Sequence, residues 1–372
     1  MYRSIPIFLS PDLEKSTQEQ VGNTVQFFTE TCGIHFDFLQ GTWSEQFLAV
    51  AARPSLVAGH ISACDPWVSQ LDLASRLARK ITATFNIDPQ TFPFAAWSWH
   101  EALSLVGSDA PTRKGARRAF RDVLADWRLK YKRAFVFGTG PSLKDAGTMD
   151  FSSGFRILCN SAVRDYEFVA KLQPHVIAAA DALYYFSDTP HAQAFQKDLE
   201  HCLRVSNAYF VYPQQYDTFV RARLREFGDR LIPVPIRRGP WKPGYLGSRW
   251  RLPARSNVLN VLLLPLAMEV STEVVLLGFD GRKEGDSGFW SYSRDHNYPD
   301  ERRLLFESHP AMFNYAIPSH DPNRYSRNVF SGQVGQDLAN YTRHGFQFAL
   351  LNETNSTDLQ GLPLLRSPED AL

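Results

Sequence analysis

Few cysteines, no long apolar run and no excess charge set the first limits on this 372-residue sequence. The four cysteines are widely spaced and form no CxxC pair, which disfavours a thiolate metal site and suits a reducing compartment. The longest apolar run, Val261 to Met268, is far shorter than the ~20 residues that a membrane-spanning helix needs. The start of the sequence has no basic stretch followed by an apolar core. We therefore expect a cytoplasmic protein with at most peripheral membrane contact.

A surplus of charge of one sign is also missing. The sequence has 40 Lys and Arg residues against 39 Asp and Glu, which gives a formal net charge of +1. Without a broad positive field, we expect no nucleic-acid partner. Hydrophobic residues make up 44% of the chain and charged residues 21%, which is typical of a globular protein, and the length suits two domains.

Seven short apolar runs after residue 130 predict β-strands. Most are apolar on both faces rather than at alternate positions, as in a sheet that helices cover on both sides. Residues 131–372 therefore predict an α/β fold with a Rossmann-like open, mostly parallel sheet flanked by helices. The predicted strands are Arg133–Phe137, Arg156–Cys159, His175–Ala180, Ala208–Tyr212, Leu231–Ile236, Glu273–Leu277 and Gln347–Leu351.

Amphipathic stretches between these runs predict the flanking helices. They are Val163–Leu172, Pro190–Leu203, Asp217–Phe227, Asn257–Val270 and Gly332–His344, the last closed by Gly345. Residues 1–130 predict an α-rich N-terminal domain of unassigned role, with helices at Leu71–Phe85 and Ala116–Lys132. The segment Arg237–Arg255, with three prolines and three glycines, predicts a long loop without regular structure.

A glycine turn directly follows the first predicted strand of the sheet. It reads Gly138-Thr139-Gly140-Pro141-Ser142. Backbone N–H groups at such a turn can hold a phosphate or a carboxylate. The turn lacks the third glycine of a dinucleotide fingerprint and the Lys-Ser/Thr pair of a P-loop, so both of those classes lose support. Ligand binding is favoured over the alternative, a tight connection from strand to helix.

Three more polar residues follow predicted strands and would lie at the same edge of the sheet. Asn160 could bond a sugar hydroxyl or a base edge, or it could cap the next helix. Asp181 and Asp280 could each face a ligand or cap a turn. No Asp-x-Asp occurs in the sequence, which argues against metal-dependent sugar transfer of the usual kind.

Several motifs occur in an order that is more specific than any one of them. They are Gly138–Leu143, Cys159–Asn160, Ser256, Leu277–Gly281, Phe289–Trp290, His309–Pro310, Tyr325 and Leu351–Thr354. In this order they resemble the bacterial lipooligosaccharide sialyltransferases and the related pterin-diphosphokinase-like and motility-accessory-factor family. The resemblance covers residues 130 to 360, over half of the chain.

The resemblance implies a metal-independent, inverting glycosyltransferase without a cofactor. Its donor would be a CMP-activated acidic sugar, such as a sialic-acid-like or Kdo residue, and its acceptor a glycan, a lipid-linked group or a protein. Cytidine would lie across the glycine turn and Asn160, while Tyr292 and Tyr298 would face the leaving phosphate. The family's basic histidine lies in a Tyr-x-x-His stretch, which here runs from Tyr325 to Asn328. Asn328 cannot act as a base.

Three histidines after Asp280 are therefore candidates for the base: His296, His309 and His320. Imidazole titrates near neutral pH and can take the proton of an acceptor hydroxyl. For His309, beside a proline, a structural hydrogen bond is an equal alternative. Further candidates are the carboxylates Asp295, Asp300 and Glu301.

The cationic segment Arg237–Arg255 could close over a donor phosphate or carboxylate, with Arg255 and Ser256 as the favoured contacts. A solvated loop is the alternative. The aromatic cluster Phe92–Trp99 could stack on an acceptor sugar, but packing between the two domains is favoured.

Two alternative functions stay open. One is a diphosphokinase of the hydroxymethylpterin type, which would need Mg²⁺ held by carboxylates such as Asp181 and Asp280. The other is a noncatalytic nucleotide- or glycan-binding partner in polysaccharide assembly, for which Asn328 at the expected histidine position is the best support.

Overall fold

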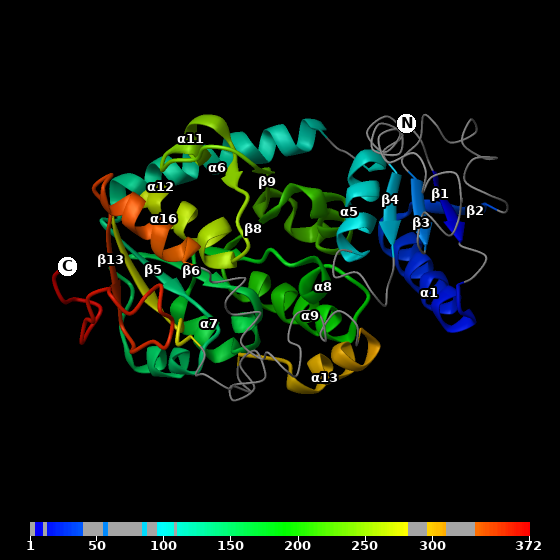
Figure 1. The fold of residues 1–372 in the computed structure, drawn as a ribbon. Helices are drawn as coiled ribbons and strands as arrows, with labels where there is room; N and C mark the ends of the chain where they lie inside the picture. Colours follow the sequence, from blue (N-terminus) through cyan, green and yellow to red (C-terminus); the bar gives the residue numbers. More distant parts are fainter. Residues whose placement is uncertain are drawn as a thin grey trace.

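A seven-stranded parallel sheet forms the centre of the molecule (Figure 1). The computed structural model describes residues 4–9, 13–39, 55–58, 84–87, 95–107, 110–281, 296–309 and 332–372. The strand order is β13-β12-β5-β6-β7-β8-β9, and every pair is parallel. The predicted Rossmann-like α/β fold is confirmed, and each of the seven predicted strands belongs to this sheet. They are β5 (Arg133–Phe137), β6 (Phe155–Cys159), β7 (Val176–Ala178), β8 (Tyr209–Pro213), β9 (Leu231–Val234), β12 (Glu273–Leu277) and β13 (Gln347–Leu350).

The direction in which strands are added reverses beside β5. From β5 the chain adds β6, β7, β8 and β9 on one side, and it then returns to place β12 and β13 on the other side. Such a reversal leaves a crevice at the carboxyl ends of the strands, where open parallel sheets bind ligands. The glycine turn after β5 and Gly278 after β12 lie at this point, because Phe137 pairs with Leu277.

Helices cover both faces of the sheet because its strands are apolar on both. In β5, Ala134 and Val136 pack on one face and Phe135 and Phe137 on the other. The first face is covered by α6 (Ala110–Lys130), α11 (Tyr245–Arg249), α12 (Leu264–Val270) and α16 (Gln333–Thr342). The second is covered by α7 (Tyr166–Leu172), α8 (Ala182–Tyr185), α9 (Pro190–Val205) and α10 (Asp217–Arg223), and α13 (Pro299–Ser308) lies against α9.

The predicted helices form, but three of them change type along their length. The parts of these three helices that are not α-helical are η3 (Asn160–Arg164), η5 (Arg225–Arg230) and η6 (Leu259–Leu263). Two further short helical segments are η2 (Pro141–Thr148) and η4 (Gln214–Tyr216). The helix predicted from Asn257 begins with the π-helical turn η6 and continues as α12. Pro265 has no N–H to donate to the preceding turn, which accounts for the change. After α16, Gly345 has a φ of 88° and donates its N–H to the Thr342 carbonyl, as a C-terminal glycine does.

The N-terminal region is partly helical, as predicted, but it also contains an unpredicted four-stranded parallel sheet of order β2-β1-β3-β4. Its elements are β1 (Ser4–Leu9), α1 (Lys15–Cys32), β2 (His35–Leu39), β3 (Ser55–Ala58), β4 (Thr84–Ile87) and α5 (Ala95–Val106). The helix predicted over Leu71–Phe85 is wrong at its end, because Thr84 and Phe85 belong to β4; its residues 71–83 lie outside the described residues. The predicted helix Ala116–Lys132 is confirmed as part of α6, which packs against β9 and α12.

The segment Arg237–Arg255 contains regular structure, so the prediction of a long loop without it is wrong. It contains α11, and its ends pair as the two short strands β10 (Ile236–Arg237) and β11 (Leu252–Pro253). Left-handed backbone at Gly244 and Trp250 brackets α11. The buried Glu269 carboxylate holds it by accepting the Leu246 N–H at 2.8 Å. Gly244 marks the start of this short helix and Gly247 lies inside it, so the glycines do not exclude a helix.

Candidate functional site

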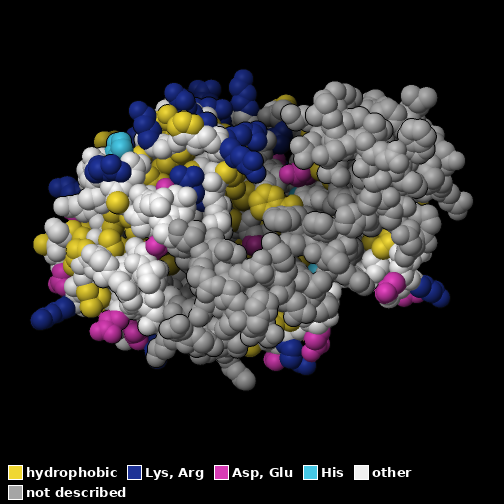
Figure 2. Space-filling model, in the orientation of Figure 1, with side chains coloured by type: hydrophobic (Ala, Val, Ile, Leu, Met, Phe, Trp, Pro, Cys, Tyr) yellow, Lys and Arg dark blue, Asp and Glu magenta, His cyan; other side chains and the backbone are white. Residues whose placement is uncertain are grey.

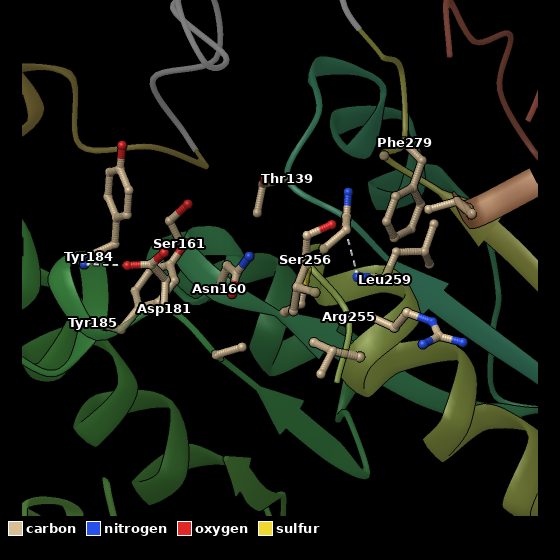
Figure 3. A pocket seen from close by; sticks show the side chains of 18 of the residues that line it. Thr139, Asn160, Ser161, Asp181, Tyr184, Tyr185, Arg255, Ser256, Leu259 and Phe279 are labelled. Atoms are coloured by element: carbon tan, nitrogen blue, oxygen red, sulfur yellow. Dashed lines mark hydrogen bonds between the residues drawn. The ribbon is translucent and has the colours of Figure 1, made fainter. Parts of the chain in front are cut away.

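A pocket of about 260 Å³ opens at the carboxyl edge of the large sheet (Figure 3). Its wall comes from the ends of β5, β6, β7 and β12, from the start of α9 and from α13. Of the predicted site residues, six line it: Gly138, Thr139, Asn160, Asp181, Arg255 and Ser256. Figure 3 shows Asn160, Ser161 and Asp181 on one side and Arg255, Ser256 and Phe279 on the other.

The glycine turn is pressed against the turn that follows β12. The Gly138 N–H donates to Leu277 and the Gly140 N–H to Gly278, both at 2.8 Å. A Cβ atom on Gly138 would lie 2.3 Å from the Gly278 carbonyl oxygen, so the close approach of the two backbones requires glycine there. Both predicted roles therefore apply in part: the turn is tight, and its first two residues face the pocket.

Asp280 does not line the pocket but stabilises the glycine turn from behind. Its carboxylate accepts the Ser142 N–H at 3.1 Å and the Ser142 hydroxyl at 2.9 Å. Burial raises the pKa of Asp280, and the bonds from Ser142 oppose that rise. Ser142, with its neighbours Gly140 and Pro141, is likewise absent from the pocket lining among the described residues. These residues hold the turn in place.

Asn160 has the least satisfied side chain at the strand ends. Its backbone is left-handed, with a φ of 52°, and such strain in a residue other than glycine is concentrated at functional sites. Its Oδ1 atom is buried and accepts no hydrogen bond from any described residue. The alternative role as a cap is not observed: η3 begins without a side-chain capping bond, and Asp165 caps the helix that follows.

Asp181 lines the pocket and also caps α8. Its Oδ1 atom accepts the N–H groups of Leu183 at 2.9 Å and Tyr184 at 3.1 Å. Asp181 is exposed to solvent in the pocket. The protein atoms around its carboxylate still remove part of its hydration, and this desolvation raises its pKa against the effect of the two N–H donors. The carboxylate is thus available to a ligand in the pocket.

Arg302 places a positive charge in the pocket wall. The residue is 9% exposed, lies at the second turn of α13 and lines the pocket. Its Nη1 atom is buried without a hydrogen-bond partner among the described residues, and burial lowers its pKa. Its guanidinium lies 5.7 Å from the Phe306 ring centre. No described carboxylate pairs with this buried guanidinium, which favours an anionic ligand.

His191 is a pocket residue that sequence analysis did not select. It is 3% exposed, and its Nδ1 lies 2.8 Å from the Tyr184 carbonyl oxygen. A carbonyl can only accept, so Nδ1 carries the proton and Nε2 has the lone pair of the neutral ring. Burial lowers its pKa to about 4, aided by the charge of Arg302. The signal was present in the sequence, because Thr189-Pro190 marks a helix start and helices after parallel strands begin at the carboxyl edge.

The predicted bases that the structure describes, His296 and His309, are not in the pocket lining. His296 is 1% exposed, with Nε2 3.4 Å from an Asp165 oxygen, and its carbonyl accepts the Ser161 hydroxyl. His309 is buried, and its Nδ1 lies 2.9 Å from the Ser308 hydroxyl. Asp300 and Glu301 lie in the first turn of α13, and neither lines the pocket.

The tyrosines expected near a leaving phosphate are only partly described. Tyr298 donates its hydroxyl to Asp198 at 2.7 Å, and its ring centre lies 5.0 Å from that of His191. It therefore packs behind His191 and is absent from the described pocket lining. The remaining candidates, His320, Tyr292, Tyr325, Asn328 and Asp295, lie outside the described residues.

Arg255 lines the pocket, but its charge is already paired. It donates to both carboxylate oxygens of Asp337, at 2.8 and 3.1 Å, and this pairing raises its pKa. Asn260 donates to the same carboxylate at 3.2 Å. The predicted donor contact thus also belongs to a network around the buried Asp337 carboxylate, which anchors η6 to α16.

Two tryptophans of the predicted aromatic cluster Phe92–Trp99 have different surroundings. Trp97, from α5, lines the pocket, and its ring lies 5.9 Å from Tyr216. Trp99 packs inside the N-terminal region against Phe28 and Phe36. The N-terminal region therefore contributes one aromatic side chain to the pocket.

Comparison with known proteins identifies no relative: no family model, no curated protein and no solved structure matches the chain. Within the described ranges, no cluster of three or more His, Cys, Asp or Glu side chains could hold a metal ion. Among the helices described, none has the length and apolar character needed to cross a membrane.

Proposed function

We propose that the protein is a glycosyltransferase that binds a CMP-activated acidic sugar in this pocket and transfers the sugar to a glycan, lipid-linked or protein acceptor. The observation that carries the proposal is a pair of buried polar atoms, Asn160 Oδ1 and Arg302 Nη1, that lack a partner among the described residues. Both side chains line one pocket. Leaving such atoms unpaired costs free energy, which a ligand of matching chemistry would offset.

A CMP-linked acidic sugar matches these two atoms. The exocyclic amino group of cytosine is a hydrogen-bond donor, and Asn160 Oδ1 is an acceptor that lacks a donor in the described part of the chain. The phosphate and the sugar carboxylate are anions, and Arg302 is a buried cation. The resemblance of the sequence to sialyltransferases supports the same donor and the same position of the cytidine.

His191 is the proposed proton acceptor. The acceptor hydroxyl attacks the anomeric carbon on the face opposite the phosphate, so the configuration inverts. As the new C–O bond forms, the bond from the anomeric carbon to the phosphate oxygen breaks and CMP leaves with the electron pair. The hydroxyl proton passes to Nε2 of His191. An anionic donor beside Arg302 would offset the charge that, after burial, helps to lower the pKa of His191, and would raise that pKa.

The diphosphokinase alternative receives less support from the described residues. It would use Mg²⁺ between carboxylates such as Asp181 and Asp280. Asp181 lines the pocket, whereas the Asp280 carboxylate is bonded to Ser142 outside the lining. The two carboxylates therefore do not face one ligand in this pocket.

Ligand-dependent thermal stability tests the binding step. CMP at ~100 times its Kd should add about 2.7 kcal/mol of stability, with or without Mg²⁺. Arg302→Gln should weaken CMP binding at least about ten-fold, because a buried charge-assisted contact is lost. Arg303→Gln is the matched control, since Arg303 is exposed and pairs with Glu307. Stabilisation by ATP with Mg²⁺ and not by CMP would overturn the proposal in favour of pyrophosphoryl transfer.

Release of CMP from CMP-sialic acid and CMP-Kdo tests the chemical step. His191→Gln should lower the rate of release by about 10²-fold or more, while CMP affinity changes less than about three-fold. His344→Gln is the control, because His344 is exposed at the end of α16. CMP binding without release from either donor would support the noncatalytic alternative instead.

A further inference from the structure

Two neighbouring segments carry far more positive charge than the rest of the chain. Helix α6 and residues 237–251 together contain twelve Lys and Arg and two Asp, whereas the whole chain has a formal net charge of +1. The other residues therefore carry a net negative charge. We define the basic surface by six exposed side chains of these segments: Lys114, Arg118, Arg237, Arg238, Lys242 and Arg249.

The two segments form one continuous face. Arg121 of α6 donates to the Ser248 carbonyl of α11 at 3.0 Å. The guanidinium groups of Arg117 and Arg121 lie 5.7 and 5.9 Å from the Trp250 ring centre. Figure 1 shows α6 and α11 side by side, and Figure 2 shows Lys and Arg side chains gathered along this edge of the molecule.

The positive charges on this face are held close together with little compensation. Lys242, Arg249 and Arg251 all lie within 5.9 Å of the Tyr245 ring centre. Of the twelve cations, Arg113 and Arg128 are the ones that form ion pairs with described carboxylates. Like charges at such spacing repel one another, and an anionic partner would relieve the repulsion.

The outer face of α6 also carries a protruding leucine. Phe120 and Leu124 are buried on the inner face of the helix. At 3.6 residues per turn, Lys114, Arg118 and Leu129 fall within about 60° of one another on the opposite face. Leu129 is 89% exposed. Leu129 lies about 16 Å along the helix from Arg118, near the end of α6. An exposed apolar side chain on the outer face of a cationic helix suits the boundary between lipid headgroups and acyl chains.

The same face is poorly suited to nucleic acid. Proteins that bind single strands stack bases on accessible aromatic rings. Here Trp250 is 7% exposed, and Trp241 donates its indole N–H to the Arg251 carbonyl and packs on Tyr341. The Tyr245 ring is already covered by cations. A phosphate-bearing lipid surface needs no such stacking.

We propose that the basic surface docks the protein on a bilayer that contains anionic lipids. The segment 237–251, which carries four of the six side chains of this surface, is continuous with the pocket wall, because Ile236 before it and Arg255 after it both line the pocket. Docking would therefore bring that wall close to the bilayer. This inference does not require the proposed function; if both hold, a lipid-linked acceptor is favoured over a soluble one.

Co-sedimentation of the full chain with vesicles tests the docking. We expect binding to phosphatidylcholine vesicles with about one third phosphatidylglycerol and at least about ten-fold weaker binding to pure phosphatidylcholine. The variant Lys114→Glu/Arg118→Glu/Arg238→Glu/Lys242→Glu should lose at least about ten-fold in affinity. The matched control, Lys15→Glu/Lys144→Glu/Lys197→Glu/Arg366→Glu, reverses four exposed cations elsewhere and should keep wild-type affinity. Equal melting temperatures of the two variants would establish that folding is intact.

Leu129→Ser separates insertion from charge. It should lower binding to the anionic vesicles about three-fold without changing the net charge of the chain. Equal binding to both kinds of vesicle, or equal losses in the basic-surface variant and its control, would overturn the proposal. Tight binding of duplex DNA or single-stranded RNA in the absence of vesicle binding would overturn it in favour of a nucleic-acid partner.

Discussion

The two halves of the pocket wall treat their polar side chains differently. In one half, Arg255 after β11 pairs with Asp337, and outside the lining Ser142 after β5 bonds to Asp280 after β12. We call this the paired half. In the other half, Asn160 Oδ1 after β6 and Arg302 Nη1 from α13 have no partner among the described residues. We call this the open half, and it also contains His191.

The difference teaches how a polar residue at a strand end divides between structure and ligand binding. A polar group that bonds to another residue of the chain contributes to stability. When that group is removed, its buried partner loses its hydrogen bond and is left desolvated, which is unfavourable. A polar group that the chain leaves unsatisfied contributes to binding, and its loss relieves that cost in the free protein. Substitutions in the two halves should therefore affect stability and CMP binding in opposite ways.

Arg255→Met should produce the largest loss of stability, because it breaks the main contact of the paired half. Asp337 is 6% exposed and would keep a buried charge without its bidentate partner. We expect a cost of about 4 kcal/mol in the free energy of unfolding, measured by urea denaturation.

The double variant Arg255→Met/Asp337→Leu provides the control, since it removes both charges. It should be more stable than the single variant. A loss below about 1 kcal/mol in the single variant would contradict the distinction between the two halves.

Acid should destabilise the protein through the open half. The pKa of His191 is lowered from 6.5 to about 4 by burial, so the unfolded chain takes up a proton that the folded chain refuses. The neutral His191 therefore contributes to the free energy of unfolding. This contribution is fully present above pH 6.5 and is lost progressively as the pH falls toward 4, by about 3 kcal/mol for one such histidine. Urea denaturation across this range should show the loss, and His191→Gln should reduce its slope.

Part of that slope should remain in the His191→Gln variant. Burial also lowers the pKa of His100 to about 4, so this residue acts with the same sign. An identical slope in the His191→Gln variant and the wild type would show that His191 is not held neutral in the pocket.

Asp280→Ala should cost less than the loss of Arg255, about 2 kcal/mol. The Ser142 N–H and hydroxyl would both lose their acceptor, and the glycine turn would lose its support. Differential scanning calorimetry measures the change. Asp145→Ala, which removes a nearby exposed carboxylate, is the control and should have little effect. Equal losses of stability in the Asp280→Ala and Asp145→Ala variants would show that the bonds from Ser142 to Asp280 do not stabilise the fold.

Asn160→Gly should have the smallest effect on stability and a clear effect on binding. Glycine adopts the left-handed backbone of this position without strain, so stability should stay within about 0.5 kcal/mol or rise. CMP affinity, measured by calorimetric titration, should fall about ten-fold because the amide acceptor is lost. Gln173→Gly is a matched control, since Gln173 also has a left-handed backbone, with φ of 46°, at the end of α7 away from the pocket. Unchanged CMP affinity would count against Asn160 as a ligand contact.

The large sheet was predictable because its strands are apolar on both faces, as in RAFVF and EVVLL. Short runs of this kind are typical of strands in a parallel sheet that helices cover on both faces. The N-terminal sheet was not predictable in the same way, because strands such as HFDFL and TFNI are short and partly polar. Their pairing depends on contacts between distant segments.

The site was predictable where the backbone alone determines it. Residues directly after parallel strands reach the carboxyl edge, and Asn160 and Asp181 do so. Which carboxylate turns to the ligand depends on packing: Asp280 faces Ser142, and the sequence does not reveal that. Arg302 enters from α13, a helix whose orientation is set by tertiary contacts, whereas the helix start at Thr189-Pro190 was a sequence signal for His191. Asn328 and Tyr325 lie outside the described residues, so the predictions for them stay predictions.

The strand order also governs the timing of assembly during synthesis on the ribosome. Strands β5 to β9 can pair one after another as the chain emerges, but β12, which completes the other side of β5, begins at Glu273. Until then, one edge of β5 presents unpaired peptide groups, a state prone to wrong pairing. The turn at Gly138 gains its neighbour Gly278 in the same late step. A truncated chain that ends before β12 would therefore aggregate and would lack a finished pocket.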